Sequence, residues 1–317
     1  MDVLLIINNA AAKARQAWPL IQNQLNEAGL SYQAYETKEA GDATLKTREA
    51  LRSGFHSIAV VGGDGTLSEV AEGFFEFNQN LDLLPTAVNP NARLAILPAG
   101  TGDDFARGLR RGRKPLKSWI ETFLSDGSNN ATQIDVLYGR SNDFEKPFIC
   151  LNASTMGIGG ETAARVAAQG KLMRRFSGEF RFVYAALAAL AGWRERRVRV
   201  TVDGRVVSDT PMNLIGVANG LYAGGGMMLS PEARVDDGKL DVVTVSGLSR
   251  ANVVTELSRV HTGGHVNNPK VKITQGEIVR IETFLVQDAM PIEADGNVRG
   301  VTPVQFQVIP KALRFQI

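Results

Sequence analysis

The sequence predicts an α/β domain with a parallel sheet, followed by a second domain that is a mostly antiparallel β-sandwich. Over residues 1–130, apolar runs typical of buried strands alternate with helical patterns. From Thr132 onward, short β-type runs dominate instead. A chain of 317 residues is long enough for two hydrophobic cores.

The first domain begins with the apolar strand Val3–Ile7 and a helix whose apolar residues recur from Ala14 to Leu25 and which ends near Gly29. The further elements expected are strand 32–37, helix Asp42–Arg52, strand 58–61, a helix after a glycine turn, and strand 93–97. Parallel sheets of this kind bind ligands beyond the carboxyl ends of their strands. Asn8, Thr37, Gly62–Thr66 and the pair Gly100-Thr101 all lie at such ends, so we expect them to converge.

The second domain is predicted from many short strands, with a hairpin turn at Asp203-Gly204. The strands expected are 134–138, 148–153, 198–203, 213–218, 240–245, 271–274, 278–283, 305–309 and 313–317, and the helices are 161–169, 179–190 and 250–260. The polar, turn-rich segment 125–130 predicts the boundary, which gives domains 1–130 and 131–317.

The most informative motif is Gly62-Gly63-Asp64-Gly65-Thr66, between a β-branched apolar run and a helical pattern. A strand that turns through glycines into a helix presents bare N–H groups and the positive end of a helix dipole, which suits a phosphate. No Lys-Ser or Lys-Thr follows, so it is not a Walker A loop, and Ser68 stands where a dinucleotide fingerprint has its third glycine.

Three further segments carry polar groups suited to chemistry. In 97–105, Thr101 offers a hydroxyl and Asp103 or Asp104 is expected to cap the next helix. The turn 234–241 gathers three aspartates, which fits either a Mg²⁺ site or a plain polar turn. Glu293, Asp295 and Asn297 alternate and would share one face of a strand, where a carboxylate could act as a general base or simply lie exposed.

The charge is nearly balanced, at +2, but basic residues form three blocks: 107–117, 171–175 and 194–199. These blocks are either solvated element ends or a surface for an anionic membrane; few aromatics interleave with them, which disfavours nucleic acid. The start has no signal-peptide pattern, the apolar stretch 180–193 is too short to span a bilayer, and Cys150 is expected in the core. A cytoplasmic protein is therefore expected.

Taken together, the motifs resemble the diacylglycerol kinase catalytic-domain family, in its bacterial YegS/BmrU-like lipid kinase branch. The residues that carry the resemblance are Gly62–Thr66, 98–107, 152–157, 231–240 and Asp295-Gly296. The resemblance implies a fold similar to NAD kinase and diacylglycerol kinase, with an ATP-binding α/β domain, a β-sandwich lipid-substrate domain, and transfer of the γ-phosphoryl group of ATP to a lipid hydroxyl in the cleft between them.

The resemblance also implies roles for single residues. Asp237 and the backbone carbonyls of Arg234 and Lys239 would hold Mg²⁺. The catalytic positions would be Asp64, which organises metal and phosphate, together with Asp295 and Asn297. ATP would be contacted by Asn8, Thr37, Gly62, Gly63, Asp64, Gly65, Thr66, Leu67, Ser68 and Thr101.

The sequence departs from the family at the position of the general base. The family's Asp-Gly-Glu is here Asp295-Gly296-Asn297, and an amide cannot take a proton at neutral pH. The early Asn-Pro-x-x-Gly loop is replaced by 8–12, and the usual Asn-Asp by Asp103-Asp104.

We therefore expect an ATP- and Mg²⁺-dependent lipid kinase of phospholipid metabolism, in which Asp64, Asp295 or Glu293 compensates for Asn297. The alternatives are a non-catalytic nucleotide- or lipid-binding regulator and an NAD kinase-like enzyme. The expected partners are a lipid substrate and the anionic inner face of the membrane, contacted peripherally, without nucleic acid. The sequence leaves open which lipid is the acceptor and whether the protein is a homodimer.

Overall fold

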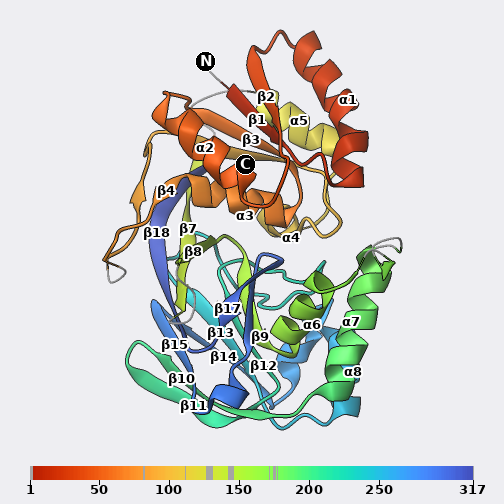
Figure 1. Cartoon of the computed structure of the whole chain (residues 1–317), viewed down its shortest axis with the longest axis vertical. Coiled ribbons are helices and arrows are strands. Elements are labelled where there is room, and N and C mark those ends of the chain that lie inside the picture. Colours follow the sequence, from red (N-terminus) through yellow and green to blue (C-terminus); the bar gives the residue numbers. More distant parts are fainter. Residues whose placement is uncertain are drawn as a thin grey trace. The chain divides into compact units, whose positions relative to one another are not determined.

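The computed structural model describes residues 3–80, 83–110, 112–125, 131–141, 146–170, 172–173, 176 and 178–316 (Figure 1). The chain divides into two compact units. Unit 1 contains Met1–Val136, Val235–Asp237 and Ile309–Ile317, and unit 2 contains Leu137–Arg234 and Gly238–Val308. Of the predicted linker 125–130, residues 126–130 lie outside the described residues. The return of the C-terminal segment to unit 1 is not visible in the sequence pattern.

Unit 1 is built on a parallel sheet in the order β2-β1-β3-β6-β18. Its strands are β1 (Val3–Ile7), β2 (Tyr32–Glu36), β3 (Ser57–Gly62), β6 (Arg93–Pro98) and the end of β18 (Val304–Gln316), with a small ribbon of β4 (Phe75–Glu76) and β5 (Thr86–Ala87). Every residue of β1 and β3 is buried, because both faces of the sheet are covered. The predicted parallel α/β domain is confirmed.

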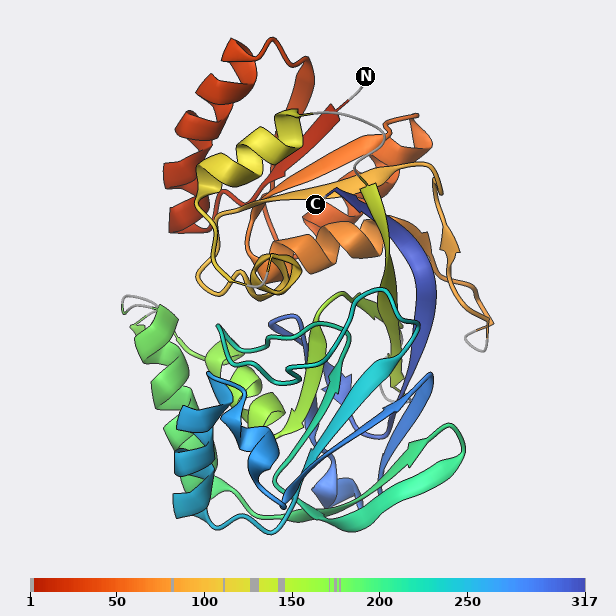
Figure 2. The same ribbon diagram turned by 180° about the vertical axis from the view of Figure 1, so that it is seen from behind.

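Helices cover both faces of this sheet (Figures 1 and 2). α1 (Ala12–Glu27) and α5 (Leu116–Leu124) pack together on one face, and α2 (Asp42–Arg52) and α3 (Asp64–Gly73) on the other. The short helix α4 (Asp104–Leu109) follows β6. In α1 the buried residues Ala14, Ile21 and Leu25 recur at helical spacing, as the sequence predicts.

Unit 2 is a β-sandwich of two antiparallel sheets. One sheet contains β7 (Ala131–Ser141), β8 (Phe148–Cys150), β10 (Arg196–Val202), β11 (Arg205–Met212), β15 (Ile278–Thr283) and the start of β18. The other contains β9 (Ala153–Gly157), β12 (Leu214–Ala218), β13 (Leu240–Val245), β14 (Val271–Gly276), β16 (Pro291–Ala294) and β17 (Asn297–Val301). Side chains of both sheets, among them Phe306 and Ile215, form one core, so the predicted sandwich is confirmed.

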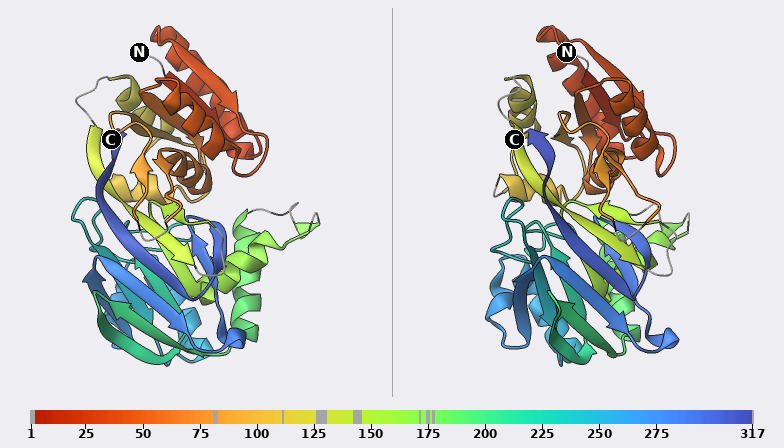
Figure 3. Two further views of the ribbon diagram at one scale, coloured as in Figure 1. Left: turned by 60° about the vertical axis from the view of Figure 1, so that its left-hand side comes forward. Right: turned by 90° about the vertical axis from the view of Figure 1, so that its left-hand side faces the viewer.

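Within the described residues, the helices outside this sandwich are α6 (Ile158–Ala167), α7 (Gly178–Gly192) and α8 (Arg250–Val260), and the 3₁₀ turns include η2 (Gly264–Asn267) and η3 (Val286–Asp288). Figure 3 shows α7 at the outer edge of unit 2. Among the described residues, we find no helix with the length and apolarity needed to cross a bilayer.

The structure corrects three details of the predicted strands. The expected strand 148–153 is two strands, because the chain turns at Leu151-Asn152. The expected strands 305–309 and 313–317 form the single strand β18, in which Lys311 adopts a positive φ of 53° and donates its N–H to Asp135. Asp295 and Gly296 form the turn between β16 and β17, so the expectation that Glu293, Asp295 and Asn297 share one strand face is wrong.

We predict that Gly160→Ala destabilises unit 2, although alanine is the better helix former. A Cβ at Gly160, in the first turn of α6, would lie 2.0 Å from the carbonyl oxygen of Pro291 on β16. We expect the free energy of unfolding to fall by about 1–3 kcal/mol. Gly170→Ala, where a Cβ would meet nothing within 4 Å, is the control and should change it by less than about 0.5 kcal/mol. Urea unfolding followed by circular dichroism measures both; equal stabilities would contradict the prediction.

Candidate functional site

Four loops meet at the carboxyl edge of the sheet in unit 1. The Nδ2 of Asn8, after β1, donates to the hydroxyl of Thr66 at 2.8 Å. Thr37, after β2, donates its N–H and its hydroxyl to the carbonyl of Ile7 at 2.9 and 3.3 Å. The convergence expected from the strand order is therefore present in the structure.

The loops after β3 and β6 touch through two glycines. A Cβ on Gly100 would lie 2.5 Å from the Cα of Gly63, and a Cβ on Gly63 would lie 3.0 Å from the Cα of Gly100. The N–H of Ala99 also donates to the carbonyl of Gly62 at 2.9 Å. Glycine is needed at both positions because any side chain would force the two backbones apart.

Asp64 links the glycine loop to α4. Its two carboxylate oxygens accept the backbone N–H groups of Asp104 at 3.0 Å and Phe105 at 2.9 Å, which begin α4. The expectation that Asp103 or Asp104 caps this helix is wrong. Asp103 has a left-handed φ of 50°, and its carboxylate accepts the N–H of Gly100 at 2.8 Å instead. The cap comes from a residue 40 positions earlier in the chain.

The first turn of α3 supplies backbone donors at this edge. The N–H groups of Gly65 and Thr66 belong to the first turn of a helix, which has no intrahelical acceptors for them, whereas Leu67 donates to Gly63 at 3.0 Å. The side chains of Leu67 and Ser68 are buried, so neither can contact a ligand except through the backbone. This arrangement suits the oxygen atoms of a phosphate.

Cationic side chains lie beside the exposed residue Thr101. Arg113 donates to the carbonyl of Thr101, and Arg107 donates to that of Gly102 at 3.0 Å. The ammonium of Lys13 is close enough to act on the charge of Asp103. The loop after β6 is therefore bordered by positive charge, which the motif itself did not reveal.

Asp103 is the titratable group most altered at this edge. Burial and the neighbouring negative charge of Asp64 raise the pKa of the Asp103 carboxyl to about 6, against the opposing effects of the Gly100 N–H, Arg113 and Lys13. Asp103 therefore changes its charge near neutral pH, next to the loop that offers donors to a phosphate.

The predicted metal ligands lie in the turn before β13, where the N–H of Asp135 donates to the carbonyl of Val235 at 2.6 Å. Asp237 is exposed there, and a carboxylate with backbone carbonyls is a donor set that fits Mg²⁺. Within the described ranges, no group of three or more His, Cys, Asp or Glu side chains could hold a metal. The predicted set is of another kind, because it combines one carboxylate with two backbone carbonyls.

Asp295 in unit 2 holds the chain between β8 and β9. Its carboxylate accepts the N–H groups of Leu151 at 2.7 Å, Asn152 at 3.0 Å and Ala153 at 3.3 Å, and the thiol of Cys150 at 3.2 Å. Burial raises the pKa of the Cys150 thiol, which lies in the core as predicted. The sequence did not indicate the role of this segment as the partner of Asp295.

Glu293 is the other carboxylate near Asn297. Its oxygens accept the hydroxyl of Thr155 and the N–H of Gly296, both at 2.6 Å. In the β16–β17 hairpin, Glu293 pairs with Val298 and Ala294 pairs with Asn297, so Glu293 lies diagonally across from Asn297. The carboxylate of Glu293 is therefore bound to the turn that directly precedes Asn297.

Several residues of the predicted basic blocks interact with other groups of the protein. In the third block, Arg194 pairs with Asp288, Arg196 with Glu161, and Arg197 and Arg199 with Asp209. In the first block, Arg110 stacks on Trp119 and donates to Ser118 and Thr122. Arg111 and the basic residues of the second block lie outside the described residues. The third block is thus largely neutralised within the protein.

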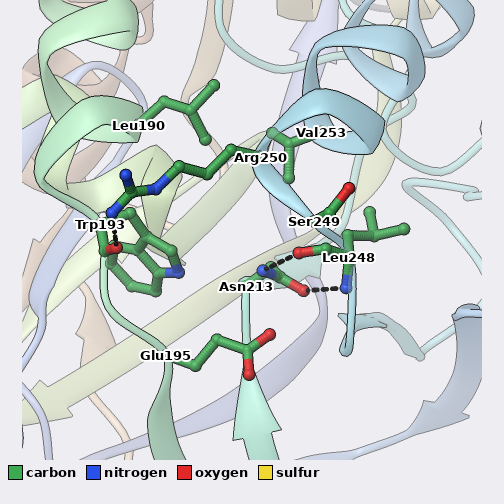
Figure 4. Close-up of a pocket in the computed structure, with 8 residues that line it drawn as sticks. All are labelled: Leu190, Trp193, Glu195, Asn213, Leu248, Ser249, Arg250 and Val253. Atoms are coloured by element: carbon green, nitrogen blue, oxygen red, sulfur yellow. Dashed lines mark hydrogen bonds between the residues drawn. The ribbon is translucent and has the colours of Figure 1, made fainter.

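A surface pocket of about 200 Å³ lies where the end of α7 meets the start of α8 (Figure 4). Arg250 donates to the carbonyl of Trp193 at 3.0 Å, and the amide of Asn213 exchanges hydrogen bonds with the backbone of Leu248. The predicted site residues do not line this pocket. Its hydrogen bonds hold the end of α7 to the rest of unit 2.

Two models of known protein families match most of the chain. Residues 2–136 match the diacylglycerol kinase catalytic domain, and residues 156–317 match the YegS C-terminal NAD kinase β-sandwich-like domain. The chain belongs to the YegS-like branch of the diacylglycerol kinase family. The resemblance noted in the sequence is confirmed.

Similar proteins cover nearly the whole chain. It is 27% identical over 305 residues to a protein named diacylglycerol kinase from Staphylococcus carnosus (strain TM300), with 95% of this chain and 90% of that protein covered. It is also 27% identical over 320 residues to "Probable lipid kinase YegS-like" from Pseudomonas aeruginosa (strain UCBPP-PA14), with 99% and 94% covered. A crystal structure of a diacylglycerol kinase from Bacillus anthracis (strain Sterne) matches with a TM-score of 0.67 at 22% identity, covering 99% and 96%, and supports the fold.

We predict that Asp103→Asn alters the pH dependence of stability. The folded pKa of about 6 lies above the ordinary aspartate value of 3.8, so Asp103 stabilises the wild type at low pH, and this contribution is lost as the pH rises from about 4 to 6. The stability of Asp103→Asn relative to wild type should therefore increase over this interval and stay constant at higher pH. Urea unfolding from pH 4.5 to 7.5 measures the difference; a constant difference would show that Asp103 does not titrate there.

Proposed function

We propose that this protein is an ATP- and Mg²⁺-dependent lipid kinase that transfers the γ-phosphoryl group of ATP to the hydroxyl of a diacylglycerol-like lipid. The observation that carries the proposal is the contact of the Gly63 and Gly100 loops at the carboxyl edge of a parallel sheet, in a chain of the diacylglycerol kinase family. The names of the relatives support a lipid as the acceptor.

The nucleotide is proposed to bind at the four loops of unit 1. The absence of side chains at Gly63 and Gly100 lets a phosphate approach the backbone, and the first turn of α3 offers N–H groups. Thr101 would add a hydroxyl, with Arg113 beside it as a source of positive charge. Phosphoryl transfer depends on positioning and charge neutralisation, and these residues supply both.

Mg²⁺ is proposed to be held by the carboxylate of Asp237 and the backbone carbonyls of Arg234 and Lys239. These are hard oxygen donors of the kind that Mg²⁺ prefers. The ion, when bound, would neutralise negative charge on the phosphoryl oxygens. Asp64 is proposed to act mainly through position, because both its oxygens already accept backbone N–H groups.

Glu293 is proposed to replace the missing general base. Asn297 is an amide, and Asp295 is only 7% exposed, with a carboxylate that accepts hydrogen bonds from the backbone of residues 151–153 and from the thiol of Cys150. Glu293 is more accessible than Asp295, and its oxygens lie at the β16–β17 turn, where they accept the hydroxyl of Thr155 and the N–H of Gly296. It thus differs from Asp295 in burial.

A second candidate is a regulator that binds nucleotide or lipid without catalysis, and Asn297 is the residue that favours it. ATP binding without phosphoryl transfer to any component of a total lipid extract would support that function. We further propose that the protein acts peripherally at the inner face of the cytoplasmic membrane, where such lipids are found.

We predict that Glu293→Gln lowers lipid-dependent ATP turnover by about 10²–10⁴-fold, because a general base contributes that much. Glu277→Gln, at an exposed glutamate of the same unit, should leave turnover unchanged. Radiolabelled γ-phosphate transfer to diacylglycerol measures both.

Asn297→Glu should raise turnover in the wild type and restore it in Glu293→Gln, because it returns a carboxylate to the vacant position. Full activity of Glu293→Gln, or no gain from Asn297→Glu in either background, would show that the base lies elsewhere.

We predict that Asp237→Asn raises the Mg²⁺ concentration needed for half-maximal activity by about 10–100-fold, since it removes the charged ligand. Asp236→Asn makes the same charge change at the neighbouring residue and should have little effect. Kinase assays over a Mg²⁺ series distinguish the two. Equal shifts in both variants would indicate a general effect of net charge instead of coordination.

A further inference from the structure

α7 exposes a stripe of large apolar side chains. Phe180 is 50% exposed, Val183 56%, Tyr184 55% and Leu187 57%. Their spacing of i, i+3, i+4 and i+7 places them on one face of the helix. Phe176, 50% exposed, extends the stripe, and its ring lies 5.0 Å from that of Phe180. We call these five residues the α7 stripe.

The opposite side of α7 is packed against unit 2. Ala185 and Ala189 are almost fully buried, and α6 packs against α7. The C-terminal end is held by the hydrogen bond from Arg250 to Trp193 (Figure 4). The stripe is therefore the exposed face of a helix whose other face is already covered. Figure 3 shows the helix itself at the outer edge of unit 2. Contiguous exposed apolar surface of this kind marks an interaction site.

The sequence around the stripe is strongly basic. Residues 165–187 contain five basic residues and one acidic residue, Glu179. The basic residues are Arg165, Lys171, Arg174, Arg175 and Arg181. Three of these basic residues, at positions 171, 174 and 175, lie outside the described residues, so only their presence in the sequence is used. Apolar and aromatic residues on one face, with flanking cations, are typical of helices that lie in the interface of anionic membranes.

Contacts within unit 2 place the N-terminal half of α7 near the β16–β17 turn. The ring of Phe182 lies 3.7 Å from the position of a Cβ on Gly224, and nearby Tyr222 accepts a hydrogen bond from the side chain of Asn152. The N–H of Asn152 in turn donates to Asp295. Figures 1 and 2 show the start of α7 and the β16–β17 turn at the same end of unit 2.

We propose that the α7 stripe inserts into the interface of an anionic lipid bilayer and so brings a membrane lipid to the end of unit 2 that carries Glu293. This inference rests on the proposed function, which needs a lipid acceptor. A helix of 15 residues is too short to span a bilayer, which takes about 20 residues, but it can lie in the interface. A second copy of the chain fits less well, because two such basic segments would repel each other.

Vesicle binding tests the proposal with the double variant Phe180→Asp/Leu187→Asp. Sedimentation with phosphatidylcholine vesicles that contain phosphatidylglycerol should show at least tenfold weaker binding than wild type. The control Leu285→Asp/Val286→Asp makes the same charge change at residues 53% and 95% exposed in the same unit, and should bind within twofold of wild type. Wild-type binding should weaken with salt. Unchanged binding of the α7 variant would overturn the proposal, as would equal wild-type binding to neutral vesicles.

A milder variant guards against misfolding. Cys150 is fully buried, so Val183→Cys offers a single reactive thiol for an environment-sensitive dye. The dye should brighten and shift to the blue with anionic vesicles, and no change would overturn the proposal. Light scattering that finds a wild-type dimer and a Phe180→Asp/Leu187→Asp monomer would overturn it too, because the stripe would then face a second copy.

An assay with a short-chain, water-soluble diacylglycerol separates this inference from the proposed function. The Phe180→Asp/Leu187→Asp variant should phosphorylate that acceptor at the wild-type rate and lose activity only on vesicles. Vesicle binding through the stripe without phosphorylation of any lipid by the wild type would refute the proposed function alone. Phosphorylation with vesicle binding unaffected by the variant would refute the stripe alone.

Discussion

The carboxylate of Asp64 holds the edge of unit 1 together through two hydrogen bonds, from the N–H groups of Asp104 and Phe105. Because α4 lacks a cap from its own sequence, its start depends on this residue of the β3 loop. The same pairing keeps Gly63 and Gly100 in contact. The donors that suit a phosphate are therefore positioned by a link between two loops and not by either loop alone.

Unit 2 uses a similar device. Asp295 lies in a two-residue turn and accepts the N–H groups of Leu151, Asn152 and Ala153, more than 140 positions away in the sequence. Both aspartates would be assigned to chemistry by their motifs, yet their oxygens already hold backbone groups. A carboxylate used in this way positions the backbone, and the lone pairs engaged by N–H groups are not available to a substrate hydroxyl. Glu293, which is more exposed than Asp295, is the proposed base for this reason.

Local patterns in the sequence predicted the elements well where burial alone decides them. β1, α2, β13, β15 and α8 have the predicted bounds, since their apolar spacing is regular. Long-range contacts could not be predicted. Nothing in the sequence near Asp103 shows that Asp64 would cap α4, and the two strands expected at 305–309 and 313–317 are the single strand β18. The exposure of the α7 stripe could not be predicted either. Its residues have the pattern of an ordinary apolar helix, and only the structure shows that they face outward.

The contact between the two glycine loops also has an electrostatic consequence. It brings the carboxyls of Asp64 and Asp103 close together, and two neighbouring negative charges in a partly buried site repel each other. Asp64 gains hydrogen bonds from two N–H groups of α4, whereas Asp103 gains one, from Gly100. Burial and the charge of Asp64 raise the pKa of the Asp103 carboxyl to about 6. An anionic phosphate at this edge would add to that repulsion and favour the protonated form of Asp103 further. Phosphate binding and the protonation of Asp103 are therefore expected to be linked, each favouring the other.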